Sequence, residues 1–334
     1  MIYLKKKIIY TFFIIICIGC LLFCAILSYK QITKPKEPVK TPNIEDKENT
    51  GTNKTQDEYI YKEELLNLGY TMEEINIIEE KISINKVKKY LLNEKYIELT
   101  SFIESEYFNY ENLNRYQKYF DKTTYTSDIV VLYVEMGLDY DFYTNVKETD
   151  TSKKELMIVN KYNRLSSDYV PKLKTLDSKY GNGKLETNTH SAFTKMCDEA
   201  KKDNINLRSV SAYRSYSTQK SIYNNYVKRN GQTKADTFSA RAGHSEHQTG
   251  LAIDINTASS NAHFENTKEY DWLINNSYKY GFILRYPLNK THITGYKYEP
   301  WHYRYVGIEA ATKIHEENIT YEEYVFKFLN NFYQ

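Results

Sequence analysis

Cysteine is scarce in this chain of 334 residues, and the few present are unevenly placed. Three of the four, Cys17, Cys20 and Cys24, lie in one apolar run near the N-terminus, which leaves Cys197 alone in the rest of the chain. A single thiol cannot form an internal disulfide, so an exported protein of this kind would be stabilised by its core or by a bound metal. Cys197 lies in a helix-like stretch and is expected to pack as a small apolar residue, because a nucleophilic thiol would need a partnered base.

The chain also lacks an excess of either positively or negatively charged residues. The 45 Lys and Arg residues nearly balance the 43 Asp and Glu residues, for a formal net charge of +2. A nucleic-acid partner would require a basic surface, so no nucleic acid is expected. Tyrosine is abundant, with 34 residues, but the excess of Lys, Asn, Ile and Tyr extends along the whole chain and indicates a compositional bias more than a binding surface. The composition indicates no particular oligomeric state.

The N-terminus contains a long hydrophobic run. Residues 8–27 are apolar apart from Tyr10 and Thr11, and three lysines precede them. A helix rises about 1.5 Å per residue, so a run of this length spans a hydrocarbon core of roughly 30 Å. Residues 1–29 are therefore predicted to form an uncleaved transmembrane anchor. The pair Gly19-Cys20 resembles a lipoprotein cleavage site, but the apolar run continues past it, whereas polar chain normally follows a lipidated cysteine.

Residues 30–57 are rich in Lys, Glu, Thr, Asn and Pro and contain almost no large apolar side chain. Such a segment cannot bury enough surface to offset its ordering entropy, so a flexible tether is predicted. Lysines flank the apolar run on both sides and do not settle its orientation. The orientation must therefore follow from the function of the C-terminal part, which is expected to lie outside the cell as the catalytic domain of a single-pass membrane protein.

Residues 58–138 have apolar residues at helical spacings and are predicted to form a small region of short helices. Gly69 is placed to end one helix, and Thr71 with Glu74 matches a capping box that begins the next. The region is interpreted as a spacer, with a wall-binding or partner-binding module as the alternative. Residues 139–175 are predicted to be a connection, in which Pro171 limits regular structure.

Helices and strands alternate in residues 176–334. Helices are expected around residues 191–201, 218–228 and 272–280, and strands around residues 207–212, 250–255, 282–285 and 301–306. This order predicts an α+β fold, in which helices flank a small antiparallel sheet. The anchor, the tether and the helical region precede this domain.

Two stretches of the C-terminal domain contain side chains suited to metal chemistry. Residues 243–254 have the sequence GHSEHQTGLAID, and residues 299–302 have the sequence EPWH. Catalytic zinc binds imidazoles and carboxylates and keeps one position open for water, whose proton a separate carboxylate then accepts. The chain contains no His-Glu-x-x-His motif, so the common helical metalloprotease arrangement is absent.

The order and spacing of these residues resemble those of the VanY-type D-alanyl-D-alanine carboxypeptidases. The resemblance depends on Ser245, His247, Gly250, Ala252 and Asp254, followed by Glu299 and His302. Three flanking motifs fit the same family: SAYRS from residue 211, LRYP from residue 284 and EPWHYRYVG from residue 299. The resemblance covers residues 159–311 and implies a zinc-peptidase domain.

The same resemblance implies that His247, Asp254 and His302 bind Zn²⁺ and that Glu299 is the general base. Pro300 stiffens the link between the base and a ligand, so the two should keep a fixed relation. If each residue is considered alone, the two histidines could be core residues, Asp254 a strand-end cap and Glu299 a surface charge. The joint pattern favours the zinc centre.

Arg214 resembles the arginine of the family that faces substrate, and it is implied to act in catalysis and in substrate binding. A guanidinium can bind a terminal carboxylate or a developing oxyanion, although Arg214 could instead form a structural ion pair. Gln219 and Ser245 are implied to hydrogen-bond the peptide. His244 is interpreted as lying behind the ligands or exposed, and Trp301 as core or pocket wall. The histidines that fit no ligand motif are His190, His263, His292 and His315.

The resemblance to the VanY-type family implies zinc-dependent hydrolysis of the C-terminal D-alanine from peptidoglycan stem peptides. An L,D-carboxypeptidase acting on tetrapeptides, or an endopeptidase acting within the stem, would use the same zinc chemistry with a different pocket shape. A non-catalytic cell-wall-binding module is the third interpretation. The presence of all the zinc-binding and base residues argues against that module.

Overall fold

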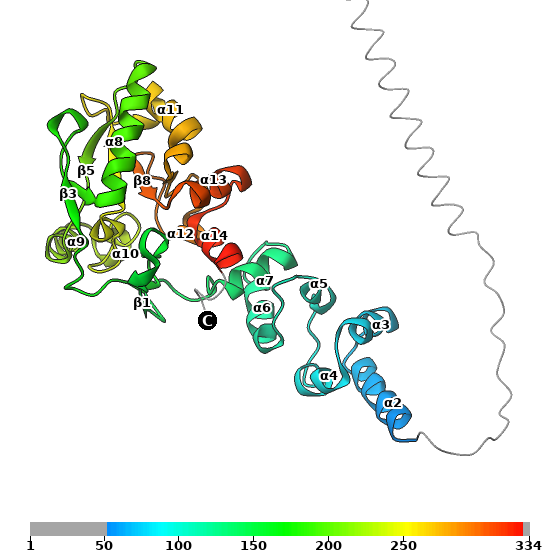
Figure 1. Ribbon diagram of the computed structural model, residues 1–334. Helices are drawn as coiled ribbons and strands as arrows, with labels where there is room; N and C mark the ends of the chain where they lie inside the picture. The colour runs from blue at the N-terminus through cyan, green and yellow to red at the C-terminus, as the bar shows by residue number, and fades with distance from the viewer. Residues whose placement is uncertain (1–51, 330–334) are drawn as a thin grey trace, which may run out of the picture. The chain divides into compact units, whose positions relative to one another are not determined.

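The computed structural model describes residues 52–329, with side chains from residue 60 onwards. By its internal contacts the chain divides into residues 1–57 and residues 58–334; the first described helix crosses this boundary, and the other elements described below lie in the second unit (Figure 1). The predicted anchor, residues 1–29, and residues 30–51 of the predicted tether lie outside the described residues. Within residues 52–329, no helix combines the length and the apolar character needed to cross a membrane.

Short helices make up the region before residue 138, as its pattern predicted. They are α2 (Thr52–Asn67), α3 (Met72–Lys81), α4 (Ile84–Tyr90), α5 (Leu99–Ile103), α6 (Leu113–Phe120) and α7 (Ser127–Glu135). Because α2 begins at Thr52, residues 52–57 are helical where a tether was predicted. Low apolar content does not exclude a helix, since Lys and Gln are good helix formers.

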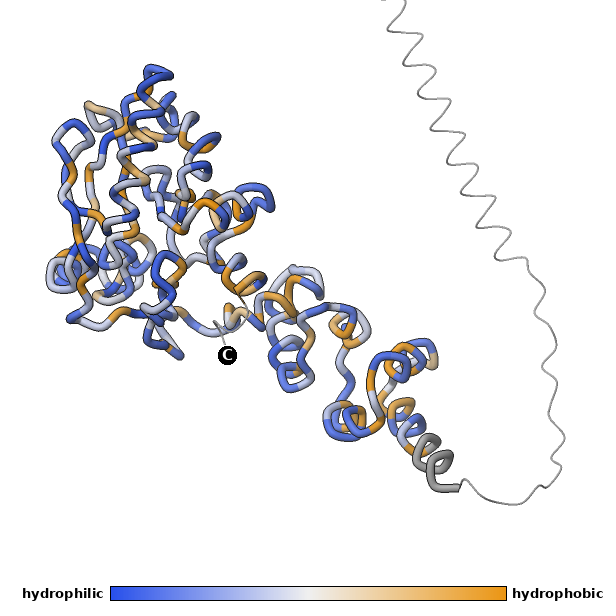
Figure 2. The backbone as a smooth tube through the Cα atoms, in the orientation of Figure 1, coloured by the Kyte–Doolittle hydropathy of each residue, from blue (hydrophilic) through white to orange (hydrophobic). Residues whose placement is uncertain are grey.

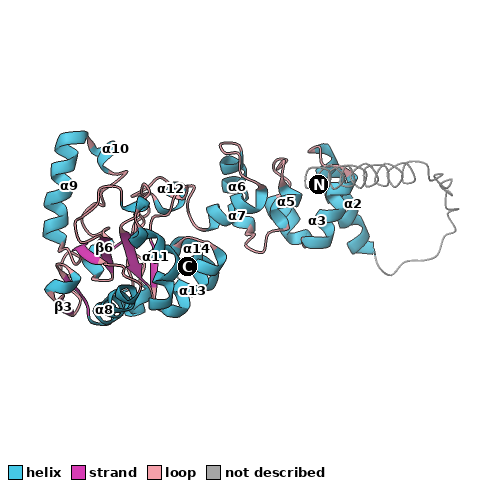
Figure 3. Ribbon diagram, turned by 90° about the horizontal axis from the view of Figure 1, so that it is seen from above, coloured by secondary structure: helices cyan, strands magenta, loops and turns pink. Residues whose placement is uncertain are grey.

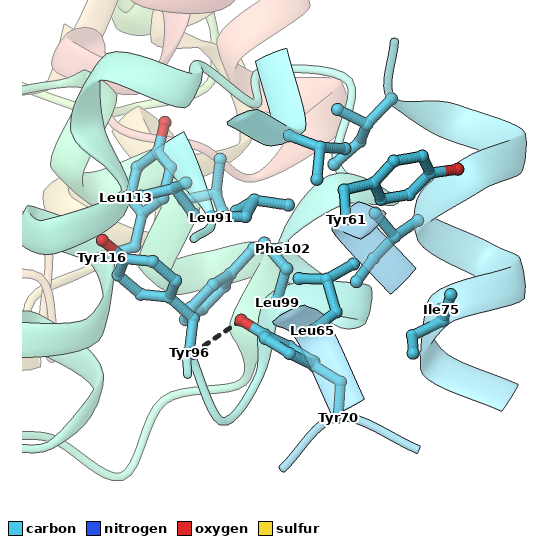
Figure 4. Packing of buried hydrophobic residues seen from close by; sticks show 14 of the residues in the cluster. Tyr61, Leu65, Tyr70, Ile75, Leu91, Tyr96, Leu99, Phe102, Leu113 and Tyr116 are labelled. Atoms are coloured by element: carbon cyan, nitrogen blue, oxygen red, sulfur yellow. Dashed lines mark hydrogen bonds between the residues drawn. The ribbon is translucent and has the colours of Figure 1, made fainter. Parts of the chain in front are cut away.

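The predicted helix boundary at Gly69 is confirmed. Gly69 follows α2 with a φ of +94°, a conformation that favours glycine. The Thr71 hydroxyl accepts a hydrogen bond from the Glu74 backbone, and the Glu74 carboxylate accepts one from the Thr71 backbone, which completes the capping box. Apolar residues are interspersed with hydrophilic ones along these helices (Figure 2). The apolar ones form a common core, within which the Tyr70 hydroxyl accepts a hydrogen bond from the Tyr96 N–H at 2.9 Å (Figure 4).

Residues 139–175 contribute to the C-terminal domain and are more than a connection. Strands β1 (Lys147–Glu148) and β2 (Asn163–Arg164) pair in parallel, and β3 (Leu173–Thr175) pairs antiparallel with β4 (Lys184–Glu186). Ile158 is buried against residues that follow the central sheet, and Val159 is buried in a second cluster. The domain therefore begins before the predicted boundary at residue 176, because this earlier segment supplies part of its core.

A four-stranded antiparallel sheet forms the centre of the C-terminal domain and confirms the predicted α+β class. Its order is β5-β6-β8-β7, with bounds β5 (Arg208–Ser211), β6 (Ala252–Asn256), β7 (Phe282–Leu284) and β8 (His302–Tyr305). The helices around it are α8 (Thr187–Lys202), α9 (Tyr216–Asn230), α10 (Gln232–Ala235), α11 (Lys268–Asn276), α12 (Thr291–Thr294), α13 (Ile308–Glu317) and α14 (Tyr321–Phe328) (Figure 3).

The two faces of this sheet differ in character. Ile253 and Ile255 of β6 and Tyr303 of β8 pack into an apolar cluster with side chains of α8 and α11. Successive side chains of a strand point to opposite faces, so Asp254 and His302 face away from that cluster. Cys197 of α8 is buried in the cluster, and burial raises the pKa of its thiol, which confirms its packing role.

Candidate metal centre and active site

The predicted zinc ligands come from three neighbouring segments. His247 lies in the 3-10 helix η4 (Glu246–Thr249), Asp254 lies in the middle of β6, and His302 is the first residue of β8. The strand register places Asp254 directly opposite His302. Gly250 ends η4 with a φ of +69°, which allows the chain to turn into β6. One donor atom from each of the three residues lies within 4.8 Å of the other two, so the structure brings the predicted ligands together.

Each imidazole directs one ring nitrogen at the Asp254 carboxylate. His247 Nε2 is 3.4 Å from Oδ2, and His302 Nδ1 is 3.0 Å from Oδ1. The other nitrogen of His247, Nδ1, is 2.7 Å from the carbonyl oxygen of Ala212, which can only accept a hydrogen bond. His247 Nδ1 therefore carries the proton, and Nε2 offers its lone pair to the cluster.

Burial and charge oppose each other among these groups. Burial lowers the pKa of His247, which favours the neutral imidazole that a metal requires. Burial alone would raise the pKa of Asp254, but the two histidines hold it well below its ordinary value. Burial alone would lower the pKa of His302, but Asp254 and Glu246 raise it to about 9. A divalent cation would replace the His302 proton, so two imidazoles and one carboxylate fit a catalytic zinc ion.

Glu299 lies beside the ligands, as predicted for the base. Its Oε2 is 3.9 Å from His302 Nδ1, and its side chain is only 16 % exposed. The His302 N–H donates to the Glu299 carbonyl oxygen at 3.1 Å, and the Glu299 N–H donates to the Tyr286 carbonyl oxygen at 3.2 Å. Burial raises the pKa of the Glu299 carboxyl to about 7, despite the opposing effect of His302. A carboxyl with this pKa can exchange protons near neutral pH, as a general base requires.

Arg214 lies next to the metal cluster and is held there by uncharged groups. Its backbone N–H donates to the His247 carbonyl oxygen at 3.1 Å. Its guanidinium donates from Nη1 to Gln219 Oε1 at 2.8 Å and from Nη2 to Ser211 Oγ at 3.0 Å. Among residues 60–329, no carboxylate forms an ion pair with Arg214, which favours a substrate-facing guanidinium over a structural ion-pair partner.

Gln219 supports Arg214 from helix α9. The side chain is buried, with its Oε1 accepting from Arg214 and its Nε2 donating to the Ala240 carbonyl oxygen at 2.6 Å. Both ends of the amide are therefore engaged within the protein. The contact of Gln219 with peptide stays a prediction, while its contact with Arg214 is a supporting role that the motifs did not indicate.

A single cavity of about 460 Å³ joins all of the predicted site residues. They are Arg214, Gln219, Ser245, His247, Asp254, Glu299 and His302. Trp301 also lines this cavity, which identifies it as pocket wall. The cavity wall includes apolar and aromatic residues that the motifs did not indicate, namely Ile222, Tyr226, Phe238, Tyr286 and Tyr296. The cavity therefore combines a candidate metal cluster, the Glu299 carboxylate and the Arg214 guanidinium with an apolar wall.

The remaining histidines lie outside the metal cluster. His244 is buried, and its Nδ1 is 2.8 Å from the Asn160 carbonyl oxygen, so it lies behind the ligands, one of the two positions predicted for it. His292 is 3.2 Å from the Tyr133 hydroxyl, and His315 stacks on Tyr278. None of these side chains contributes to the donor group found within residues 60–329.

A buried charge network lies behind His302, and the motifs did not predict it. Glu246 Oε1 accepts from Arg285 Nε at 2.8 Å and from Arg304 Nη1 at 2.9 Å. Arg285 also donates to both oxygens of Glu322, at 2.9 Å and 2.6 Å. The two positive and two negative charges balance, as burial of charged groups requires. The sequence offered one indication of this network, because Glu246 is a charged residue between Ser245 and the predicted metal ligand His247.

The chain was compared with known proteins, and residues 182–308 match the family model VanY, D-alanyl-D-alanine carboxypeptidase. YodJ of Bacillus subtilis (strain 168), whose name describes a carboxypeptidase, is 39% identical over 210 residues, which cover 58% of this chain and 77% of the relative. A D-alanyl-D-alanine carboxypeptidase of Enterococcus faecalis (strain ATCC 700802 / V583) is 37% identical over 192 residues, which cover 54% of this chain and 69% of the relative. The chain belongs to the VanY family.

A solved structure supports the VanY-family fold. The LD-carboxypeptidase LdcB has 40% sequence identity and a TM-score of 0.52, with coverage of 55% of this chain and 91% of that chain. The residues matched by the VanY model, 182–308, contain every predicted site residue. The helical region before residue 138 lies outside that match.

Proposed function

We propose that this VanY-family chain is a zinc-dependent carboxypeptidase that removes the C-terminal D-alanine from peptidoglycan stem peptides. The observation that carries the proposal is the meeting of His247, Asp254 and His302 with Glu299 and Arg214 in one cavity. Relatives named D-alanyl-D-alanine carboxypeptidases support the substrate class.

The chemistry divides among the residues of the cavity. A zinc ion bound by the two histidines and Asp254 would supply a polarised water and an electrophile for the scissile carbonyl oxygen. Glu299 accepts the proton of the attacking water and can pass it to the leaving amine nitrogen, because its carboxylate lies beside the ligands and a carboxyl group can act first as a general base and then as a general acid. Arg214 uses two of its five N–H donors on Gln219 and Ser211, so the others can bind the terminal carboxylate or the oxyanion.

The test is release of D-alanine from a stem pentapeptide by the purified full-length chain. We expect turnover to require zinc and to fall ~10²–10⁴-fold in Glu299→Gln, because the variant cannot accept the proton. Glu316→Gln makes the same substitution at an exposed position of α13 and should retain activity. Turnover by Glu299→Gln within a few-fold of the unmodified chain would refute the mechanism.

A second specificity, L,D-carboxypeptidase activity on tetrapeptides, is supported by the similarity to LdcB. Mass analysis of products from parallel tetrapeptide and pentapeptide reactions separates the two. Loss of one D-alanine from the pentapeptide alone supports D,D-cleavage, and loss from the tetrapeptide supports L,D-cleavage. A cut within the stem would indicate an endopeptidase. A zinc content near zero together with binding to cell wall would indicate the non-catalytic module.

We also propose that residues 1–29 anchor the chain in the cell membrane, with residues 58–334 outside. The apolar run of residues 8–27 supports the membrane anchor. The extracellular location of peptidoglycan supports the orientation. Proteinase K added to intact cells should degrade the C-terminal domain. Protection of the domain until the cells are lysed would contradict the proposal.

A further inference from the structure

Glu246 combines complete burial with an incompletely used carboxylate. Its side chain is 0 % exposed, and Arg285 and Arg304 both donate to the same oxygen, Oε1. The second oxygen, Oε2, accepts no hydrogen bond from any residue in the described range. A buried carboxylate oxygen without a partner is rare, because leaving it unpaired costs free energy.

A ring nitrogen of a predicted zinc ligand lies close to Oε2. His302 Nε2 lies 3.5 Å from Glu246 Oε2, and it too has no hydrogen-bond partner among the described residues. The opposite nitrogen, Nδ1, faces Asp254 Oδ1 at 3.0 Å. A shift of a few tenths of an ångström would turn the 3.5 Å approach into a hydrogen bond. The two unpaired atoms therefore complement each other.

We propose that Glu246 is a positioning residue that accepts the Nε2–H of His302 and thereby keeps the Nδ1 lone pair of His302 directed at the metal. The inference rests on the proposed zinc site. His247 is held in the same way through its other nitrogen, by the Ala212 carbonyl oxygen. The site thus sets the tautomers of its two imidazoles with one backbone oxygen and one buried carboxylate.

The arginines explain why this position requires a carboxylate. Arg285 and Arg304 donate to Oε1 and hold the carboxylate plane, which leaves Oε2 as an acceptor toward His302. In Glu246→Gln, the amide oxygen must serve the two arginines, so the amide NH₂ would face His302 Nε2. Two donors cannot bond each other, and His302 would have to accept at Nε2 and carry its proton on Nδ1. That tautomer blocks the lone pair needed by the metal.

The test measures zinc binding in the full-length chain by competition with a fluorescent chelator. We expect Glu246→Gln to raise the zinc dissociation constant ~10–100-fold, the range seen when groups behind metal ligands are altered. Glu322→Gln is the matched control, because it removes a charge from the same buried network but contacts Arg285 and not His302. Its zinc affinity should change by less than about threefold. Equal losses in both variants, or an unchanged affinity in Glu246→Gln, would overturn the inference.

A spectroscopic measurement covers the case in which Glu246→Gln fails to fold. In the zinc-loaded unmodified chain, ¹⁵N NMR of labelled histidine should show His302 protonated at Nε2. Protonation at Nδ1 would overturn the inference. Failure of the proposed function is distinguishable, because absence of D-alanine release would refute the hydrolase while leaving the zinc affinities and the His302 tautomer as measured.

Discussion

Replacement of Glu299 by Gln should stabilise the metal-free protein at neutral and alkaline pH. Burial raises the pKa of this carboxyl from 4.5 to about 7, so the folded state binds the Glu299 proton more tightly than the unfolded state. One pH unit corresponds to about 1.4 kcal/mol, so ionised Glu299 costs the folded protein about 3 kcal/mol. Gln resembles the protonated carboxyl in shape and carries no charge, so the variant avoids this cost.

The sign of the effect depends on pH. Below about pH 4.5 Glu299 is protonated in both states, and the variant should gain less than about 1 kcal/mol. As the pH rises from 4.5 through 7, the unmodified protein loses free energy of unfolding, because the Glu299 carboxyl ionises more readily in the unfolded state. The variant has no ionisable group at this position and keeps its stability. The full gain of about 3 kcal/mol is expected at pH 8. A destabilising base at the centre of the site is consistent with the exchange of stability for activity seen in enzymes.

The assay is urea unfolding of both proteins in the presence of a chelator, at pH 4.5 and pH 8. Glu316→Gln is the control and should change stability little at either pH. Zinc should reduce the gain at pH 8, because a bound cation stabilises the ionised carboxylate. An equal gain at both pH values, or destabilisation by Glu299→Gln at pH 8, would refute the reasoning.

The remaining predictions concern activity. Because the base must be ionised, kcat/KM should fall toward acid pH. Burial raises the pKa of Glu299 to about 7 in the metal-free protein, and a bound zinc ion would move the midpoint of this fall below 7. A profile flat between pH 5 and pH 8 would contradict this. Arg214→Met should lower kcat/KM ~10²–10³-fold by removing a donor to the carboxylate or oxyanion. Arg229→Met, at an exposed position of α9, should leave steady-state kinetics unchanged, and equal kinetics in both variants would exclude the role of Arg214.

Much of the local structure follows from short-range patterns in the sequence. Thr71 and Glu74 form the predicted capping box because both partners lie within one helical turn. The alternation in β6 places Ile253 and Ile255 in the core and Asp254 on the opposite face, which is a property of any strand. The spacing of the family motifs then predicted which three residues meet in the candidate metal cluster and which carboxylate lies beside them.

Other features depend on contacts between residues distant in sequence. Ile158 belongs to the core of the C-terminal domain through neighbours that follow the sheet, so the domain boundary could not be placed from composition. The Gln219 amide that accepts from Arg214 is held at its other end by the Ala240 carbonyl oxygen, 21 residues further along the chain. No local pattern distinguishes such residues from ordinary polar positions.

The charge network at Glu246 shows most clearly which features follow from the sequence and which follow from the tertiary structure. The sequence determined that a glutamate precedes the predicted zinc ligand His247, and it determined the presence of Arg285, Arg304 and Glu322. Only the tertiary structure decided that these four groups meet in the interior, with Glu246 Oε2 facing His302. The physical reason is that an unpaired buried charge is costly, so compensation comes from whichever segments the fold brings together, whatever their separation along the chain.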